Sequence, residues 1–593
     1  MKPTDYRDPE YYHKVVDCQY ACPAHTPVPQ YIRLIAAGKY TEAYMVNWES
    51  NVFPGILGRT CDRPCEPACR RGRVEEEPVA ICRLKRVASD FKDDVSHLMP
   101  DIPLTKNGKK IALIGGGPAS LSVARDLAPL GYELHVYDDQ TKGGGMMRTQ
   151  IPSFRLPIHV LNQEVEQILN LGIITHFNQY ITSLKSIVNE DYDAVFVGTG
   201  APKGKDLILP GREEGSANIF IGIEWLASVA FEHTEKIGKR VIVLGGGNTA
   251  MDCCRTSRRL GGDEVKVIVR SPFAEMKASP WEKEDAMHED IPIIDNHVPK
   301  SYVTENGRLT GMLFEKVEAI YENGKRRLVP TGEPDVFFPA DDVIIAIGQE
   351  NKFEWVERDL GIEFDQWDMP VVNETTFAST RPGLFFGGDA ALGPKNIITA
   401  VAQGHNAAIS IDLYCQGEDI NQRPAPDTKL FSTKMGIHEW SYDNDITTEF
   451  RFPVPQADKK ETLSDRKKEV ELGFDLKTAF REAQRCLNCD VQTVFSESKC
   501  IECDACMDIC PTNCITFTYN EDEEGLRMKL LVPAVNETQD ILVSDILKTG
   551  KIMVKDEDLC LHCGLCAERC PTAAWDMQEF LYNTAKAGHH CYV

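Results

Sequence analysis

Two dense cysteine runs near the carboxyl end constrain this chain more than any other feature of its sequence. Each run has three cysteines spaced by two residues and a fourth, three residues later, just before a proline: Cys500, Cys503, Cys506 and Cys510, then Cys560, Cys563, Cys566 and Cys570. In doubled runs of this kind, three thiolates hold one 4Fe–4S cluster and the fourth holds its neighbour. Zinc also uses paired cysteines, but not this doubled pattern with prolines. The spacing therefore predicts one cluster on Cys500, Cys503, Cys506 and Cys570, and another on Cys560, Cys563, Cys566 and Cys510.

Composition limits the class of protein. The chain has 593 residues, 21 cysteines and a formal net charge of −25. The acidic balance argues against nucleic acid, which needs a basic surface. The opening segment lacks the apolar region of a secretory signal, and no run reaches the ~18 apolar residues of a membrane span. We therefore expect a cytoplasmic protein whose clustered thiols bind metal rather than form disulfides.

Two glycine-rich turns each follow an apolar strand pattern. The first turn, 115–120, follows the pattern 110–114, and Asp138 ends the next strand pattern. Its glycines permit a tight turn and a close approach of backbone amides to a pyrophosphate, and Asp138 suits a ribose hydroxyl. The second turn, 245–250, has no acid at the end of its next strand pattern. Two such sites on one chain indicate FAD and a nicotinamide dinucleotide.

The fold class expected from these patterns is multidomain α/β. We expect an N-terminal α-helical iron–sulfur domain, two Rossmann-like nucleotide-binding domains with one inserted in the other, and a C-terminal α+β ferredoxin-like domain. The expected boundaries are 1–105 for the N-terminal domain, 106–235 and 345–418 for the FAD-binding domain, 236–344 for the NAD(P)-binding domain, 419–495 for a linker with a cysteine pair, and 496–593 for the ferredoxin-like domain.

Three further segments are interpreted as strands of the FAD-binding half. They are 194–200, 342–349 and 384–389. The last ends on Asp389 before a helical pattern, where an acid could bind the ribityl hydroxyls of a flavin. Taken alone, Asp389 is equally compatible with an ordinary helix N-cap.

From residue 15 to 490 the sequence resembles the small subunit of glutamate synthase and its relatives, which include the matching half of dihydropyrimidine dehydrogenase and the NADPH-binding subunits of bifurcating transhydrogenases. The motifs that carry the resemblance lie at 143–148, 151–157, 245–252 and 387–389. The resemblance implies FAD at the first turn, with Asp138 on the adenosine ribose and Asp389 on the ribityl chain. It implies a nicotinamide ring stacked on the flavin for hydride transfer, with no catalytic side chain beyond the cofactors.

The resemblance implies two sets of cofactor-binding residues. The predicted FAD-binding residues are Gly115, Gly117, Pro118, Ala119, Ser120, Asp138, Gly145, Met146, Arg148, Arg155, Gly200, Gly388, Asp389, Asn396 and Ile397. The predicted NAD(P)-binding residues are Gly245, Gly247, Asn248, Thr249, Arg270 and Gly348.

The pair Arg270-Ser271 departs from the family pattern. NADP-specific relatives carry two consecutive arginines here for the 2′-phosphate, and a guanidinium suits a phosphate well. Arg255 or Arg259 could compensate for the missing arginine. The sequence therefore favours NAD(H) over NADP(H).

Two of the six cysteines of the N-terminal segment are predicted to share a cluster with a distant pair. Relatives with two clusters here place a Cys-x2-Cys pair just before the position of Cys18, and this chain has none. Its pair Cys486 and Cys489 comes instead just before the ferredoxin-like module. The predicted clusters are Cys18, Cys69, Cys486 and Cys489, and then Cys22, Cys61, Cys65 and Cys82. The alternative is a single N-terminal cluster, three in the chain rather than four. Non-ligand roles are expected for Cys253, Cys254, Cys415, Cys514 and Cys591.

Together these features predict an electron-transfer flavoprotein subunit that exchanges electrons between NAD(P)H and 4Fe–4S clusters through FAD. The appended ferredoxin-like module implies a hetero-oligomer with a catalytic partner, such as a 2-oxoacid:ferredoxin-type oxidoreductase, or exchange with a ferredoxin. The NADPH-oxidising small subunit of a glutamate synthase is a second interpretation. A non-catalytic electron carrier or scaffold, with vestigial nucleotide turns, is a third.

Overall fold

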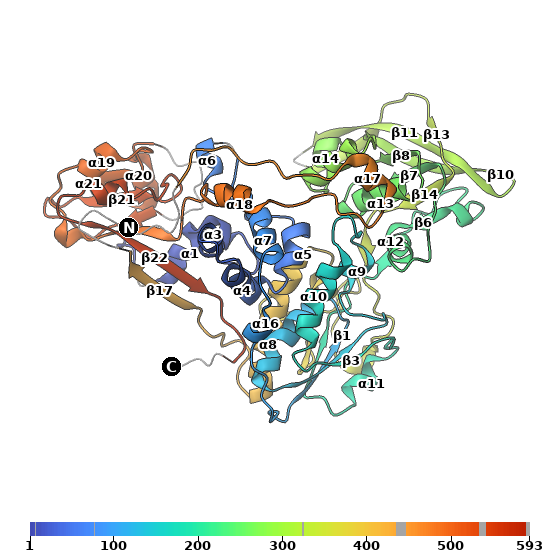
Figure 1. Cartoon of the computed structure of the whole chain (residues 1–593), viewed down its shortest axis with the longest axis horizontal. Helices are drawn as coiled ribbons and strands as arrows, with labels where there is room; N and C mark the ends of the chain where they lie inside the picture. The colour runs from blue at the N-terminus through green and yellow to red at the C-terminus, as the bar shows by residue number, and fades with distance from the viewer. Residues whose placement is uncertain (6–7, 76, 323–324, 434–445, 533–540, 589–593) are drawn as a thin grey trace. The chain divides into compact units, whose positions relative to one another are not determined.

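The computed structural model describes the chain except for residues 6–7, 76, 323–324, 434–445, 533–540 and 589–593 (Figure 1). It divides into two compact units. One, here called the cysteine-rich unit, consists of Met1–Met99, Gln422–Val454 and Gly473–Val593. The other, called the α/β unit, consists of Pro100–Asn421 and Pro455–Leu472. Among the described helices, none has the length and apolar character that crossing a membrane requires.

The first sheet of the α/β unit is parallel, with strand order β16-β4-β1-β2-β3. Its strands are β1 (Lys110–Ile114), β2 (Glu133–Tyr137), β3 (Ile174–His176), β4 (Ala194–Val197) and β16 (Leu384–Phe386). The helices of this region are α8 (Pro118–Leu127), α9 (Met146–Thr149), α10 (Ile158–Leu169), α11 (Leu184–Val188), α15 (Asp389–Leu392) and α16 (Ile397–Gln416). Strands β4 and β16 are buried at every position, as in parallel sheets covered on both faces.

The second sheet is also parallel, with order β6-β14-β7-β8-β9. Its strands are β6 (Ile219–Ile221), β7 (Arg240–Leu244), β8 (Glu264–Ile268), β9 (Ile293–Ile294) and β14 (Asp342–Ile345). Its helices are α12 (Gly222–Ala230), α13 (Asn248–Arg259) and α14 (Pro280–His288). The expectation that 342–349 belongs to the FAD-binding half is corrected here, because β14 pairs with β6 and β7. A fully buried apolar run fits the centre of either sheet, so its sequence did not specify which.

The remaining strands of the α/β unit are antiparallel. Strands β10 (His297–Glu305), β11 (Arg308–Glu322), β12 (Lys325–Pro330) and β13 (Val336–Pro339) form one sheet around β11. Strand β15 (Gln349–Glu350) pairs with β5 (Lys203–Gly204). Helix α17 (Lys459–Ser464), from the expected linker, contacts α13.

The cysteine-rich unit joins helices from both ends of the chain. Its helices are α1 (Pro9–Val15), α2 (Asp17–Tyr20), α3 (Val28–Ala36), α4 (Tyr40–Asn51), α5 (Pro54–Thr60), α6 (Gly72–Glu75), α7 (Ile81–Asp90) and α18 (Leu476–Ala483). Helix α5 packs closely on α7, since a Cβ at Gly58 would lie 2.7 Å from the Cα of Arg86. Helix α18 contacts both α3 and α7. The last part of the expected linker therefore shares a core with the N-terminal helices.

Two three-stranded antiparallel sheets complete this unit. One has the order β17-β22-β18, formed by β17 (Asp427–Ser432), β18 (Val491–Phe495) and β22 (Trp575–Asn583). The other has the order β19-β21-β20, formed by β19 (Ile515–Thr518), β20 (Ile541–Val543) and β21 (Ile552–Asp556). The accompanying helices are α19 (Ala505–Ile509), α20 (Glu523–Met528) and α21 (Leu565–Arg569).

Candidate cluster and nucleotide sites

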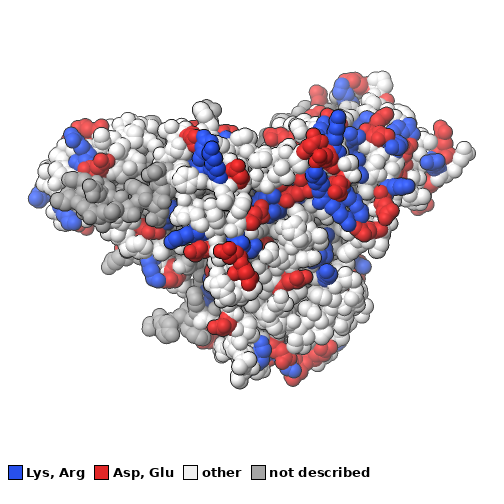
Figure 2. All heavy atoms as spheres, in the orientation of Figure 1, with Lys and Arg blue, Asp and Glu red and all other residues white. Residues whose placement is uncertain are grey.

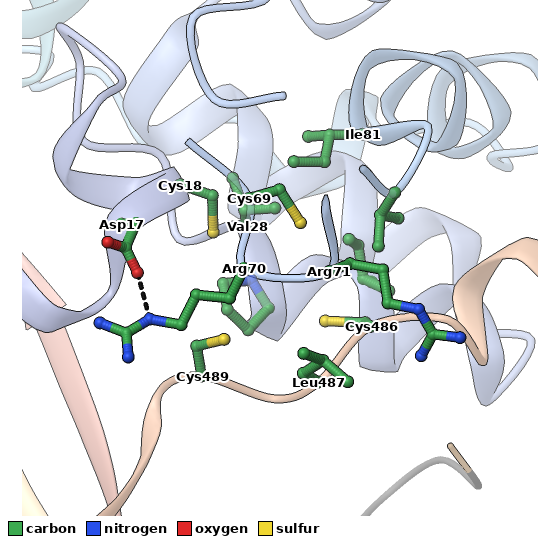
Figure 3. A pocket seen from close by; sticks show the side chains of 13 residues that line it. Asp17, Cys18, Val28, Cys69, Arg70, Arg71, Ile81, Cys486, Leu487 and Cys489 are labelled. Atoms are coloured by element: carbon green, nitrogen blue, oxygen red, sulfur yellow. Dashed lines mark hydrogen bonds and ion pairs between the residues drawn. The ribbon is translucent and has the colours of Figure 1, made fainter. Parts of the chain in front are cut away.

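Four thiols from three separate parts of the chain line one small cavity (Figure 3). Cys18 lies in α2, Cys69 in the turn before α6, and Cys486 and Cys489 in the loop after α18. In Figure 3 their four sulfur atoms point towards the space between them. The structure thus brings together the four distant cysteines that the sequence analysis assigned to one cluster. We call these four cysteines set B.

Three cysteines of set B are buried and Cys69 is half-buried, and neighbouring thiols raise one another's pKa. Burial raises the pKa of Cys18 well above its usual value, and Cys69, Cys489 and Cys486 raise it further. Burial also raises the pKa of Cys486 to about 12. Four thiolates in one buried cavity repel one another unless cations lie between them. The donor set therefore fits a metal–sulfur cluster, for which thiolate is the usual ligand.

Buried polar contacts fasten the Cys486–Cys489 loop to the N-terminal segment. The guanidinium of Arg33, in α3, donates to the two carboxylate oxygens of Asp490 at 2.6 and 2.7 Å. The guanidinium of Arg485 donates to the backbone carbonyl of Pro78 at 3.0 Å. These contacts hold the two thiols of the loop opposite Cys18 and Cys69.

Cys22, Cys61, Cys65 and Cys82 form a second buried group, set A. Hydrogen bonding with Cys61 and Cys65 holds the pKa of the Cys82 thiol well below its usual value. The ammonium of Lys85 lies beside all four: burial lowers its pKa, but their charges raise it on balance. A buried cation next to four thiolates suits a site that carries net negative charge once iron is bound.

In each of two further cavities, three cysteines of one carboxyl-terminal run lie with the fourth cysteine of the other run. Set C is Cys510, Cys560, Cys563 and Cys566, which line one cavity together with Lys555. Set D is Cys500, Cys503, Cys506 and Cys570, which line another beside Phe495 and Trp575.

The expected non-ligand cysteines lie in different surroundings. Cys514 lines the cavity of set C, and its Sγ lies 3.5 Å from that of Cys510. Cys253 and Cys254 are buried in the core beside the second sheet, and Cys415 is half-buried on α16. Cys591 lies outside the described residues.

The first glycine-rich turn joins β1 to α8. Gly115 has a φ of +94°, and a Cβ there would lie 2.6 Å from the carbonyl oxygen of Gly198. Gly117 caps α8 and has no side chain to occupy the free amides that begin the helix. Asp138 accepts the N–H of Gly116 at 2.6 Å, and burial raises its pKa. Helix, glycines and acid converge as a dinucleotide requires.

The second turn joins β7 to α13 in the same way. Gly245 has a φ of +136°, and a Cβ there would lie 2.1 Å from the carbonyl oxygen of Ala346. Around Gly247, the N-cap of α13, no described atom lies within 4 Å of the place a Cβ would take. The Asn248 side chain accepts the N–H of Ser279 at 2.8 Å. This open N-terminus of a twelve-residue helix can take a pyrophosphate.

Other predicted flavin residues lie near the first turn. Gly145 approaches Gly117, since a Cβ there would lie 2.9 Å from the Gly117 Cα. Asp389 begins α15, and burial raises its pKa to about 6. Asn396 caps α16 by accepting the N–H of Thr399 at 3.0 Å, so Ile397 is the first residue of that helix. Several further predicted sites require left-handed backbone: Gly200, Gly348 and Gly388.

Two arginines predicted to bind FAD have protein partners. Arg155 forms ion pairs with Asp252 at 2.7 Å and Glu282 at 2.5 Å, which tie the 151–157 motif to α13 and α14. Arg148 donates to the Gly143 carbonyl at 2.8 Å and thereby braces the loop before it. Both side chains hold the protein's own loops, a role that the motif alone did not indicate.

The cations that could compensate at the 2′-phosphate position are already paired. Arg255 and Arg259 are buried, and both form ion pairs with Glu289, at 2.9 and 2.6 Å. Arg270, two residues after the end of β8, is exposed. The expectation that Arg255 or Arg259 could compensate is therefore corrected, because salt bridges inside the core hold both.

Comparison with known proteins agrees with this geometry. Residues 109–404 match the family "pyridine nucleotide-disulphide oxidoreductase", residues 12–96 match domain II of dihydropyrimidine dehydrogenase with its 4Fe–4S cluster, and residues 499–574 match the 4Fe–4S dicluster domain. The β subunit of the NADP⁺-dependent formate dehydrogenase of Moorella thermoacetica is 34% identical over 80% of this chain and 70% of its own length. This chain belongs to the pyridine nucleotide oxidoreductase family that includes the glutamate synthase small chains.

Two further relatives are similar to most of this chain. The β subunit of the NADPH-Fe(3+) oxidoreductase of Geobacter sulfurreducens is 30% identical over 82% of this chain and 77% of its own length. The glutamate synthase [NADPH] small chain of Azospirillum brasilense is 31% identical over 68% of this chain and 86% of its own length. The chain is thus an oxidoreductase whose cofactors are FAD, a nicotinamide dinucleotide and 4Fe–4S clusters.

Proposed function

We propose that this oxidoreductase exchanges electrons between a nicotinamide dinucleotide and a partner protein through FAD and four 4Fe–4S clusters. The observation that carries the proposal is the grouping of sixteen cysteines into four sets of four in the cysteine-rich unit. Three of those sets combine distant ligands: set B joins the N-terminal segment to the second half of the chain, and sets C and D each combine both cysteine runs. A chain with a single N-terminal cluster would have no need of the Cys486–Cys489 loop at set B.

The chain's own residues position the cofactors. A flavin accepts a hydride and releases electrons one at a time, and each cluster takes one electron. The two uncapped helix N-termini at Gly117 and Gly247 would hold the two pyrophosphates, and Asp138 would bind a ribose. The half-buried carboxyl of Asp389 would accept hydrogen bonds from the flavin's ribityl chain. Nothing in this arrangement activates a further organic substrate, which we assign to a partner.

In this proposal, the chain and its partner protein form a hetero-oligomer. Support comes from the names of the relatives, which are subunits or chains of larger enzymes. Set D offers a place of exchange, because Cys503 is exposed and the neighbouring Ile501 is 56% exposed. A 2-oxoacid:ferredoxin-type oxidoreductase, or a ferredoxin, is the partner that we propose. On the face seen in Figure 2, acidic and basic side chains are interspersed.

The proposed dinucleotide is NAD(H). Support comes from the single exposed Arg270 and from the burial of Arg255 and Arg259 in ion pairs. The names of the relatives favour NADP(H) instead, because they specify NADP or NADPH. A steady-state comparison decides: a ten-fold higher specificity constant for NADPH would overturn the choice of NADH.

Iron analysis and native mass spectrometry test the proposal. Reconstituted protein should hold about sixteen irons, at four per cluster, and about twelve would exclude the fourth cluster. Native protein should co-elute with a catalytic subunit and should reduce dyes with NAD(P)H. Co-elution with a glutamate synthase large chain would support the second interpretation, and a lone chain without dye reduction would support the scaffold.

A further inference from the structure

Sets B and C are joined by two buried side chains to which the sequence assigned no role. His562 is 2% exposed and Arg70 is 1% exposed. His562 lies in the second cysteine run between Cys560 and Cys563, and Arg70 directly follows Cys69. Each side chain starts beside a predicted ligand of one cluster and ends on a predicted ligand of the other.

The imidazole of His562 spans the two sets. Its Nδ1 lies 2.9 Å from the carbonyl oxygen of Cys489, in set B. A carbonyl oxygen only accepts, so Nδ1 carries the proton and donates. The ring's Nε2 lies 3.4 Å from Oε2 of Glu557. A ring nitrogen also lies within 4.8 Å of the thiol sulfur of Cys560, in set C. The His562 backbone N–H also points to that sulfur, at 3.4 Å.

Arg70 makes the same connection from the opposite direction. Its guanidinium donates to the carbonyl oxygen of Cys560 at 2.5 Å and also to the carboxylate of Asp17, the residue before Cys18. Its Nη1 lies 3.5 Å from Nε2 of His562. The two side chains therefore form one continuous polar contact between set B and set C.

The four sets follow one another in space. Ile81, the residue before Cys82 of set A, lines the cavity of set B. Helix α19, which carries Cys506 of set D, contacts helix α21, which carries Cys566 of set C. With His562 and Arg70 between B and C, the order is A, B, C, D.

We propose that His562 and Arg70 form the bridge by which electrons cross from set B to set C, so that set B is the entry to the ferredoxin-like module and set D its exit. This inference rests on the proposed four clusters. In the step, the cluster of set B is oxidised by one electron and the cluster of set C is reduced by one electron, or the reverse when the flow is reversed; no bond forms or breaks, and no proton moves. Tunnelling weakens steeply with distance and is favoured along bonds, so a chain of covalent and hydrogen bonds accelerates it.

The first cysteine run supplies a matched control. Glu502 occupies, between Cys500 and Cys503, the place that His562 occupies in the second run. Both residues have a left-handed backbone, with φ of 56° and 52°, and both backbone N–H groups point to a cysteine sulfur at 3.4 Å. The Glu502 side chain, however, bonds Thr549 rather than a second cluster set. Of these two residues, His562 contacts a second cluster set, whereas the described contact of the Glu502 side chain is with Thr549.

The experiment compares His562→Asn, His562→Gln and Glu502→Asn in the full-length reconstituted protein. Asparagine tolerates the left-handed backbone, but its side chain is too short to reach both Cys489 and Cys560. Glutamine keeps the length and an N–H donor. After rapid mixing with the reduced dinucleotide, freeze-quench EPR follows the reduction of N-terminal and ferredoxin-like clusters separately, and iron content is measured on each variant.

In His562→Asn we expect the full iron content and an unchanged rate of reduction for the clusters of sets A and B. Reduction of the clusters of sets C and D should be slowed about ten-fold or more, which is the range typical of outer-shell partners of metal sites. Partial recovery is expected in His562→Gln, and wild-type rates in Glu502→Asn. Unchanged reduction of sets C and D in His562→Asn with full iron would overturn the bridge alone. Iron lost from both His562 variants would give the residue a structural role only and would also overturn it. Wild-type protein with about twelve irons or fewer would instead refute the four-cluster proposal.

Discussion

Arg33 and Asp490 lie 457 positions apart in the chain, yet they form a two-point ion pair with N–O distances of 2.6 and 2.7 Å. Both side chains are almost fully buried. The same guanidinium also reaches Glu579 in β22, at 2.8 Å. This contact ties α3, the Cys486–Cys489 loop and strand β22 together, so we expect the assembly of set B to depend on it.

Replacing Arg33 by methionine should therefore destabilise the cysteine-rich unit and empty set B. The change leaves the Asp490 carboxylate buried without its cation, which typically costs about 3–5 kcal/mol. The free energy of unfolding and the iron content measure the two effects. The matched control is Arg358→Met, which breaks an exposed pair with Asp368 and should cost less than about 1 kcal/mol. Full iron in the Arg33 variant would contradict the role given to this pair.

Replacing Cys489 by alanine should lower the iron content by about four per chain, because set B loses a ligand. The other three sets lie on different thiols and should keep their clusters. Cys415→Ala is the control, since Cys415 is half-buried on α16 and belongs to no set. Equal iron in both variants would show that set B holds no cluster.

Two glycines of the second nucleotide turn should respond differently to alanine. At Gly247 the structure has room for a methyl group and an extended backbone, so Gly247→Ala should fold normally but obstruct the pyrophosphate and raise the KM for the dinucleotide. At Gly245 the methyl group would meet the Ala346 carbonyl at 2.1 Å, so Gly245→Ala should lower the melting temperature as well. Thermal unfolding and steady-state kinetics separate the two. Normal KM in Gly247→Ala would place the dinucleotide elsewhere.

Ser271→Arg should raise the specificity constant for NADPH relative to NADH. It restores the second of two consecutive arginines, and a hydrogen bond to a charged group contributes about 1.5–3 kcal/mol, roughly ten-fold or more. Steady-state kinetics with both dinucleotides measures the ratio. Arg326→Ser is a control, because Arg326 pairs with Glu275 at 2.5 Å, and its loss should leave the ratio unchanged. If Ser271→Arg leaves the ratio unchanged, the 2′-phosphate does not bind near residues 270 and 271.

Features that depend on short stretches of sequence could be predicted from the sequence alone. Strand, glycine turn and acid recur at fixed spacing, so both nucleotide turns were predictable, and set C and set D followed from the exchange of the fourth cysteine between runs. Set B was predictable only because a pair missing from one place was present at another. The family assignment and the layered α/β fold agree with the comparisons.

Partner choice among charged and buried residues was not predictable. The sequence suggested cofactor or phosphate contacts for Arg155, Arg255 and Arg259. In the structure, each forms an ion pair with a carboxylate on or next to α13 or α14. His562 and Arg33 carry no motif, because their importance depends on segments more than 70 positions away. The placement of β14 depended on competition between two parallel sheets that accept the same apolar pattern.

Asp389 should make the stability of the FAD-free protein depend on pH. Burial raises its pKa to about 6, from an ordinary value of 3.8. An acid with a raised pKa is penalised in the folded state when it is charged, so the penalty is absent below pH 3.8, grows between pH 3.8 and about 6, and is complete above that. At about 1.4 kcal/mol per pKa unit, the full penalty is about 3 kcal/mol.

Asp389→Asn removes that charge. The FAD-free variant should therefore be more stable than the FAD-free wild type at pH 7.5, by up to about 3 kcal/mol, and the gain should shrink towards zero near pH 4. FAD affinity should fall in the same variant, because the amide is a weaker acceptor for the ribityl hydroxyls. Denaturant unfolding at the two pH values and flavin titration measure both effects, with Asp359→Asn as an exposed control that should show no gain. A stability gain that is equal at both pH values would show that the charge of Asp389 is not its cause, and unchanged flavin affinity would remove Asp389 from the FAD site.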